Sequence, residues 1–202
     1  MLKSKRRPAE LTAHPSVLVL YGSPHPKGKT WRLYEAFAQA IPADATVTVY
    51  SAYERRPEPC LDCGYCARHE GCSQHDLDEF MALFEACDIF VLVTPVYYNS
   101  FPAPLKAVID RFQRYYSARF DRGIKPPIAK PRLAAVLATC GSDEREGLNE
   151  VRAQFKRAAT VLNCTVAGAA FARGTDDAGV TDRALDGARR LGEKIFDGWL
   201  FE

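Results

Sequence analysis

Five short apolar runs along the chain predict five β-strands. Most of these runs are continuous rather than alternating between apolar and polar residues, which is typical of strands in a parallel sheet that is buried on both faces. The expected strands are Ser16–Leu20, Ala45–Tyr50, Ile89–Thr94, Leu133–Thr139 and Cys164–Phe171.

Between these runs, apolar residues recur at the helical spacing of three to four and predict five amphipathic helices. The stripes are Leu33, Phe37, Ala40 and Ile41; Leu77, Phe80, Met81 and Phe84; Leu105, Val108, Ile109 and Phe112; Leu148, Val151, Phe155 and Leu162; and Leu185, Ala188, Leu191 and Ile195. Thr30 is placed to cap the first helix. Asp76 and Glu79 have the spacing of a capping box for the second. Pro104 suits the first turn of the third.

The alternation of strands and helices predicts an α/β domain with right-handed crossovers and a parallel sheet between two layers of helices. Two irregular stretches interrupt the alternation, Tyr53–His75 and Ser117–Pro131. In such sheets, ligands bind beyond the carboxyl ends of the strands, at the switch point between the first and third strands. We therefore expect the loops that follow these two strands to form the functional site.

The composition is that of one soluble globular domain. A length of 202 residues suits a single well-buried domain at residues 14–202, preceded by a basic tail at residues 1–13 that we expect to be disordered. Lys and Arg number 27 against 25 Asp and Glu, so the net charge of +2 gives no electrostatic reason to bind nucleic acid or an anionic membrane. No apolar run approaches the roughly 20 residues of a membrane helix. We predict neither nucleic acid nor membrane as a partner.

The loop after the first strand, Tyr21–Thr30, has the composition of an anion-binding turn. It reads Tyr-Gly-Ser-Pro-His-Pro-Lys-Gly-Lys-Thr and leads into a helix, so backbone N–H groups and the positive end of the helix dipole would face an anion. It is not a Walker loop, because Ser23 stands where the first glycine would be. Alone, this loop is consistent with phosphate binding or with an ordinary tight turn.

The loop after the third strand, Thr94–Lys106, carries two adjacent tyrosines. Tyr97 and Tyr98 could form a wall for a flat aromatic ring, and the alternative is aromatic packing beneath a surface loop. A third loop, Thr139–Ser142, leaves the neighbouring fourth strand. A phosphate at one loop and a planar ring at another describe a mononucleotide, and flavin mononucleotide (FMN) fits best.

Four of the seven cysteines are crowded into one irregular stretch. They are Cys60, Cys63, Cys66 and Cys72. A secreted disulfide framework would spread its cysteines along the chain, so the clustering indicates a metal in a reducing cytoplasm. Closely spaced thiolates can wrap an iron–sulfur cluster. Zinc usually takes separated Cys pairs or histidines, and His69 and His75 are nearby. The cysteine cluster therefore has three interpretations at this point: an iron–sulfur cluster, a zinc site, or a loop without metal.

Together, these motifs resemble those of the flavodoxin-like NAD(P)H-dependent FMN reductases, particularly the iron–sulfur flavoproteins. The shared marks are Gly22-Ser-Pro with Gly28 and Thr30, the cysteines followed by Asp76-Leu-Asp78, Pro95-Val-Tyr97, and Pro102-Ala-Pro-Leu-Lys106 with Asp110-Arg111. The resemblance extends from Val17 to the last helix. It implies a flavodoxin-like, doubly wound, five-stranded sheet in the order 2-1-3-4-5, with helices on both faces.

The resemblance also assigns residues to the cofactors. It implies that the FMN phosphate is held by Ser23, His25, Lys29 and Thr30. It implies that the isoalloxazine and ribityl chain are lined by Pro95, Val96, Tyr97, Tyr98 and Asn99, and the far edge by Gly141 and Ser142. It implies a [4Fe-4S] cluster on Cys60, Cys63, Cys66 and Cys72. His25 stands where relatives often carry arginine, so Lys27 or Lys29 is expected to supply the charge.

The implied activity is that of a cytoplasmic flavin reductase. FMN would take a hydride from NADH or NADPH and pass electrons to a quinone, nitro compound, flavin or protein acceptor, through the iron–sulfur cluster where one is bound. An electron carrier like flavodoxin or ferredoxin, without an organic substrate, is the alternative, and a non-enzymatic binding module is a third hypothesis. No hydrolase motif is apparent.

The resemblance further implies a homodimer or homotetramer. The candidate interface aromatics are Phe101, Tyr115, Tyr116 and Trp199.

Overall fold

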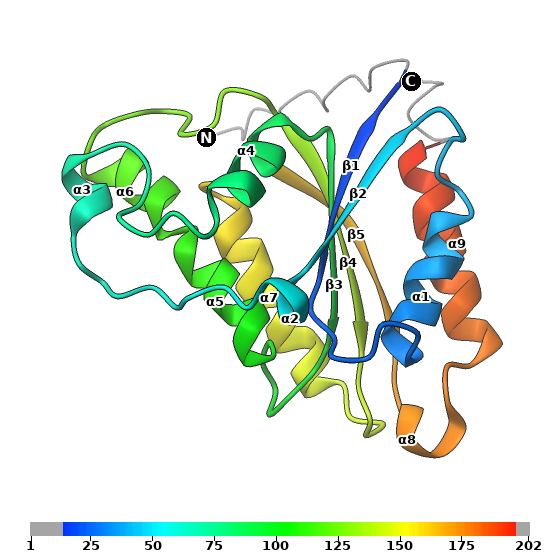
Figure 1. Ribbon diagram of the computed structural model, residues 1–202. Helices are drawn as coiled ribbons and strands as arrows, with labels where there is room; N and C mark the ends of the chain where they lie inside the picture. The colour runs from blue at the N-terminus through cyan, green and yellow to red at the C-terminus, as the bar shows by residue number, and fades with distance from the viewer. Residues whose placement is uncertain (1–13, 197–202) are drawn as a thin grey trace, which may run out of the picture.

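The computed structural model describes residues 14–196 and contains a five-stranded parallel sheet (Figure 1). The strands are β1 (Ser16–Tyr21), β2 (Thr46–Ser51), β3 (Ile89–Pro95), β4 (Arg132–Thr139) and β5 (Cys164–Ala172). Their order is β2-β1-β3-β4-β5. The predicted strands and their order are confirmed, and each predicted end lies at or next to the observed one.

The central strands are enclosed on both faces. Every residue of β4 is buried, and so is every residue of β3 before Pro95. Along β1 the side chains alternate between two cores: Leu18 and Leu20 pack on one side of the sheet, and Val17 and Val19 on the other. This two-sided burial explains why the apolar runs in the sequence are continuous.

Helices cover both faces of the sheet, as predicted. In Figure 1, α1 and α9 lie on one side, and α4, α5 and α7 lie on the other. Their bounds are α1 (Lys29–Ala38), α4 (Asp78–Ala86), α5 (Ala103–Arg111), α7 (Glu146–Ala159) and α9 (Asp182–Phe196). Shorter helices lie between them: α2 (Ala52–Arg55), α3 (Tyr65–Arg68), α6 (Gln113–Phe120) and α8 (Thr175–Ala178).

The predicted cap of α1 is wrong, whereas the proline of α5 is where it was expected. Gly28 precedes α1, and Thr30 is already the second helical residue. The Thr30 hydroxyl instead lies 2.7 Å from the hydroxyl of Thr139, at the end of β4, and both are buried. Pro104 lies in the first turn of α5. The first turn of α1 therefore has no side-chain cap.

The predicted capping box of α4 is also wrong. The helix starts at Asp78, one residue later than the box requires, and Leu77 precedes it without a side-chain cap. The Asp76 carboxylate accepts hydrogen bonds from two other partners, described below, so it is not available to pair with Glu79 as a cap. A stronger tertiary interaction has replaced the local one.

The first and fourth predicted stripes extend two or three residues past the ends of their helices, and the third extends one residue, Phe112, past α5. Ala40 and Ile41 follow α1, which ends at Ala38, and Leu162 follows α7, which ends at Ala159. All three still pack against the core from the turns that lead to the next strand. Burial therefore continues after the helical hydrogen bonds have stopped.

The helix α6 occupies part of a stretch that the sequence analysis left irregular. It follows α5 after Phe112 and buries Tyr115 and Ala118 against the core. Phe101 is buried as well, so Phe101 and Tyr115 are core residues of this chain and not the interface aromatics that were expected. Tyr116 is exposed.

The predicted basic tail, residues 1–13, and Trp199 lie outside the described residues. Between residues 14 and 196, the length and apolar character that a membrane-crossing helix needs are not found together in any helix.

Candidate functional site

A pocket of about 630 Å³ lies at the carboxyl ends of β1, β3 and β4. It is formed by the three loops that the sequence analysis singled out, together with the start of α8. All the residues expected to bind FMN line it: Ser23, His25, Lys29, Thr30, Pro95, Val96, Tyr97, Tyr98, Asn99, Gly141 and Ser142. The fold thus brings residues from distant parts of the chain to one cavity at the switch point of the sheet.

The first loop presents free backbone donors to this pocket. Because Gly28 has no side chain to cap α1, the amides of the first helical turn have no side-chain partner. Thr30 and Thr139 share one hydrogen bond, so one of the two hydroxyl protons is still available to a ligand. The helix dipole adds positive potential at the same place. These features together favour an anionic group.

One lysine of the loop faces the pocket, and the other does not. Lys29 lines the cavity, and its ammonium lies 3.0 Å from the carboxylate of Asp176 on α8. Lys27 is exposed and is not among the lining residues. Of the two lysines considered as the source of positive charge, Lys29 therefore has the suitable position.

The tyrosine loop forms a tight turn at the mouth of the pocket. Tyr97 and Ser100 exchange two backbone hydrogen bonds, of 3.0 and 2.9 Å. Between them, Tyr98 and Asn99 both have positive φ, 48° and 57°, as a type I′ turn requires. A tyrosine in this region of φ is unusual. The turn leaves Tyr98 fully exposed, so packing beneath the loop does not explain this residue.

The pocket also contains residues that the sequence analysis missed. Thr175 and Asp176 come from the turn after β5, and the Thr175 hydroxyl donates a 3.0 Å hydrogen bond to the carbonyl of Cys140. Cys140, which belongs to the expected third loop, also lines the cavity. The Asp176 carboxylate lies against Gly141, where a Cβ would approach it to 2.2 Å. A glycine directly followed by Thr-Asp after the last strand is the one sequence signal that could have indicated this fourth loop.

The four clustered cysteines lie around a second, smaller cavity. Cys60, Cys63, Cys66 and Cys72 all line a pocket of about 140 Å³, together with Ser117 and other residues of α6. All four are free thiols. Within residues 14–196 no three of these or other acidic, His or Cys side chains are arranged as a ready set of metal ligands. The fold gathers the thiols at one cavity, but not at ligating distances.

Two of these thiols have polar partners, and the nearby histidines are directed elsewhere. The Cys66 thiol donates to Ser117 Oγ at 3.6 Å. Hydrogen bonds from the Ser73 hydroxyl and from the Tyr65 amide lower the pKa of the Cys63 thiol, which favours its thiolate. His69 stacks on Tyr65, and His75 pairs with Asp78, so neither lines the cysteine pocket.

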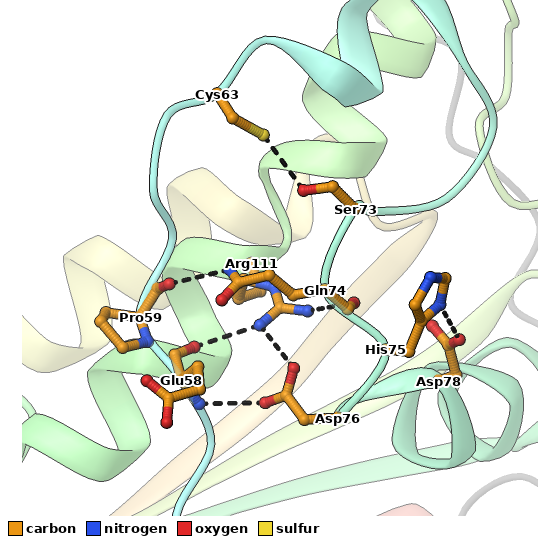
Figure 2. A network of polar contacts seen from close by, with 9 residues as sticks. All are labelled: Glu58, Pro59, Cys63, Ser73, Gln74, His75, Asp76, Asp78 and Arg111. Carbon is orange, nitrogen blue, oxygen red and sulfur yellow. Dashed lines mark hydrogen bonds and ion pairs between the residues drawn. The ribbon is translucent and has the colours of Figure 1, made fainter.

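A buried arginine closes the base of the cysteine loop, residues 53–75 (Figure 2). The Arg111 guanidinium, 2% exposed on α5, donates to the carbonyls of Glu58 at 3.1 Å and Gln74 at 2.7 Å. It also pairs with the Asp76 carboxylate at 2.9 Å, and the other carboxylate oxygen accepts the Glu58 amide. The Gln74 amide donates to the carbonyl of Pro59 at 3.0 Å. These bonds tie the two ends of the loop together.

We call these contacts of Arg111 with Glu58, Gln74 and Asp76 the Arg111 clasp. The negative charge of the Asp76 carboxylate is part of it. Burial alone would raise the pKa of Asp76, but hydrogen bonds from the Glu58 amide and from Arg111 outweigh burial and hold the pKa below its ordinary value. The clasp therefore stabilises the fold above the pKa of an unfolded aspartate, and this contribution is lost as the pH falls through the lowered pKa. Without the carboxylate, Arg111 would be a buried charge without a counter-ion.

The two cavities are separate. The cysteine pocket and the pocket at the strand ends share no lining residue. In Figure 1 the cysteine loop leaves α2 and runs outward to α3, beside α6. The cysteines therefore lie on the side of the sheet that α4, α5 and α7 cover.

Comparisons with known proteins find iron–sulfur flavoproteins among the relatives of this chain. An iron–sulfur flavoprotein of Archaeoglobus fulgidus is 26% identical over 182 residues, which cover 89% of this chain and 78% of the relative. An iron–sulfur flavoprotein of Methanocaldococcus jannaschii is 31% identical over 97 residues, 47% of this chain and 50% of the relative.

Solved structures with the same fold include an NAD(P)H:quinone oxidoreductase from Methanothermobacter marburgensis. Its TM-score is 0.70 at 21% identity, and the match covers 91% of this chain and 96% of that one. An azoreductase from Bacillus anthracis gives a TM-score of 0.68 at 17% identity, covering 89% and 99%. The family model for NADPH-dependent FMN reductases matches residues 15–178. Because this match spans most of the chain, the protein belongs to the NADPH-dependent FMN reductase family.

Proposed function

We propose that this reductase binds FMN in the pocket at the strand ends and transfers electrons from NAD(P)H to a quinone or a related organic acceptor. The observation that carries the proposal is the convergence of all the expected FMN residues on one cavity. Family membership supports FMN and NAD(P)H as cofactor and co-substrate. The quinone oxidoreductase and azoreductase among the structural neighbours support an aromatic acceptor. A nitro compound, a free flavin and a protein remain candidate acceptors.

In this proposal the first loop holds the phosphate. The uncapped amides of α1, the Ser23 and Thr30 hydroxyls and the Lys29 ammonium would surround it, with His25 at the rim. Charge-assisted hydrogen bonds to phosphate are the strong ones. Lys29 would exchange its present partner, the Asp176 carboxylate, for the phosphate.

The second and third loops would hold the ring and the ribityl chain. Pro95, Val96 and the turn at Tyr97–Ser100 would form one wall, and Gly141 with Ser142 would form the far edge. FMN, when bound, supplies the hydride and electron chemistry at its ring. In this proposal the nicotinamide and the acceptor would reach the ring in turn, beside the exposed Tyr98.

We further propose that Cys60, Cys63, Cys66 and Cys72 ligate a [4Fe-4S] cluster. Four free thiols around one small cavity, with no histidine in its lining, are the donor set that such a cluster takes. Zinc with histidine ligands is less well supported, since His69 and His75 have other partners. The names of the iron–sulfur flavoprotein relatives favour the same metal. We expect the loop to tighten around the metal.

A homodimer or homotetramer stays a prediction.

The phosphate assignment predicts that Ser23→Ala with Lys29→Gln weakens FMN binding. Each lost hydrogen bond to a charged phosphate is worth about 1.5–3 kcal/mol, so the dissociation constant should rise at least about 10-fold. Titration of apoprotein with FMN, followed by flavin fluorescence, measures this. Lys27→Gln is the control, because it removes the same charge from the same loop without touching the pocket. An equal effect in both variants would show that the phosphate lies elsewhere.

The reductase assignment predicts that NADPH or NADH bleaches the flavin absorbance of the FMN-loaded protein under nitrogen. Turnover should then continue when a benzoquinone or an azo dye is added. Stopped-flow absorbance measures the reduction, and steady-state oxidation of the nucleotide measures turnover. Flavin that dithionite reduces and neither nucleotide touches would instead support an electron carrier.

The cluster assignment predicts that Cys63→Ser lowers the iron content and the broad visible absorbance but spares FMN binding. A missing ligand leaves one iron of the cluster open to solvent. The protein is purified without oxygen, and iron, sulfide and zinc are assayed. Cys164→Ala is the control, because it removes a thiol outside the loop. Zinc, or no metal, in the anaerobic wild type would contradict the assignment.

A second variant tests the cluster assignment by weakening the Arg111 clasp at the base of the cysteine loop. Asp76→Asn keeps all four thiols but leaves Arg111 without its counter-ion, and should accelerate loss of iron to a chelator while FMN binding is unchanged.

A further inference from the structure

A second large cavity, of about 560 Å³, opens beside β5 and shares no lining residue with the proposed FMN pocket or the cysteine pocket. Four arginines line it: Arg145, Arg173, Arg183 and Arg190. They come from the loop after β4, the turn after β5 and one face of α9. Phe171 and Leu148 contribute apolar surface to the same cavity. We call it the arginine pocket.

Within residues 14–196, three of these four guanidinium groups have no counter-ion. Arg173 pairs with Asp143, the one carboxylate that lines the pocket. Among the described residues, Arg145, Arg183 and Arg190 take part in no ion pair or side-chain hydrogen bond. Like charges around one concavity repel one another, and a bound anion relieves that repulsion. Guanidinium groups also match the geometry of phosphate oxygens.

The helix α9 leaves room for a ligand between Arg183 and Arg190. Arg183, Gly187 and Arg190 follow at the spacing of one helical face. A Cβ placed at Gly187 would meet nothing within 4 Å, so this position is open space. Glycine in a helix interior costs stability relative to alanine, and here it keeps the centre of the pocket clear.

The arginine pocket and the proposed FMN pocket share a wall. Ser142 lines the FMN pocket, and the next residue, Asp143, lines the arginine pocket. On the facing turn, Arg173 lines the arginine pocket and Thr175 the FMN pocket, and the Gly174 amide between them donates to the Ser142 carbonyl at 2.8 Å. A ligand extending from one cavity to the other crosses only this pair of loops.

We infer that the arginine pocket binds the phosphorylated adenosine end of NADPH while the nicotinamide lies in the FMN pocket. This rests on the proposed function. NADPH differs from NADH only in the 2′-phosphate of the adenosine ribose. Arg183 and Arg190, with Arg145, contact that phosphate and make the enzyme prefer NADPH. The pocket is thereby a specificity site of the reductase, remote from the reacting ring.

The test compares Arg183→Gln/Arg190→Gln with a control of equal charge loss, Arg152→Gln/Lys156→Gln on the exposed face of α7. The arginine variant should raise the KM for NADPH about 10-fold or more, since charged hydrogen bonds to phosphate are lost. Its kcat, its KM for NADH and its affinity for FMN should stay near the wild-type values, and the control should resemble the wild type.

Binding of adenosine 2′,5′-bisphosphate, measured by calorimetry, gives a readout without turnover. The wild type should bind it and the arginine variant should lose that binding. Gly187→Leu, which fills the pocket and keeps both arginines, should also lose it. Equal loss in the α7 control, or full NADPH preference in the arginine variant, overturns the inference and leaves the reductase function intact. If neither nucleotide reduces the flavin, the proposed reductase function fails. Loss of bisphosphate binding in both pocket variants would then still support a site for a phosphorylated nucleoside.

Discussion

The two-sided burial of β1, β3 and β4 is the constraint on which the other features of this protein depend. A strand whose two faces are both covered by helices leaves only its ends for polar chemistry, and parallel strands bring their carboxyl ends to one edge. The phosphate loop, the tyrosine turn and the Gly141–Ser142 loop therefore meet although they are far apart in sequence. Loops at the end of such a rigid sheet can hold a flat ligand without a second domain.

The cysteine loop depends on a different interaction. It is anchored by one buried guanidinium rather than by a hydrophobic core of its own. Arg111 binds two carbonyls and one carboxylate from the ends of the loop, so the segment that carries the thiols is closed at its base before any metal binds. Such an arrangement lowers the entropy that a metal must overcome in ordering the loop.

The fold was predictable to the extent that burial leaves a periodic signal. The ends of β1, β3 and β4 were placed to within a residue because these buried strands are continuously apolar. The errors fall where a tertiary contact outcompetes a local one: Thr30 bonds Thr139 instead of capping α1, and Asp76 pairs with Arg111 instead of capping α4. No local pattern reveals a partner that lies so far along the chain.

The functional residues likewise fall into those that a local sequence pattern reveals and those that only the fold brings together. The glycine, tyrosine and cysteine motifs were visible because they are contiguous. Neither the contribution of Asp176 nor the arginine pocket was visible in the sequence. Each depends on residues that only the crossover after β4 and the turn after β5 bring together. Apart from the Gly-Thr-Asp turn at residues 174–176, their residue types, single aspartates and arginines among many, carry no signal until the sheet has placed them.

The central claim is that the cavity at the carboxyl ends of β1, β3 and β4 is the FMN site, and an experimental structure of the protein with FMN tests it most directly. The account predicts the phosphate within hydrogen-bond distance of the first amides of α1 and of Lys29, with the ring beside Tyr97 and Asn99. A phosphate seated among Arg145, Arg183 and Arg190, or a ring outside the turn at Tyr97–Ser100, would contradict it.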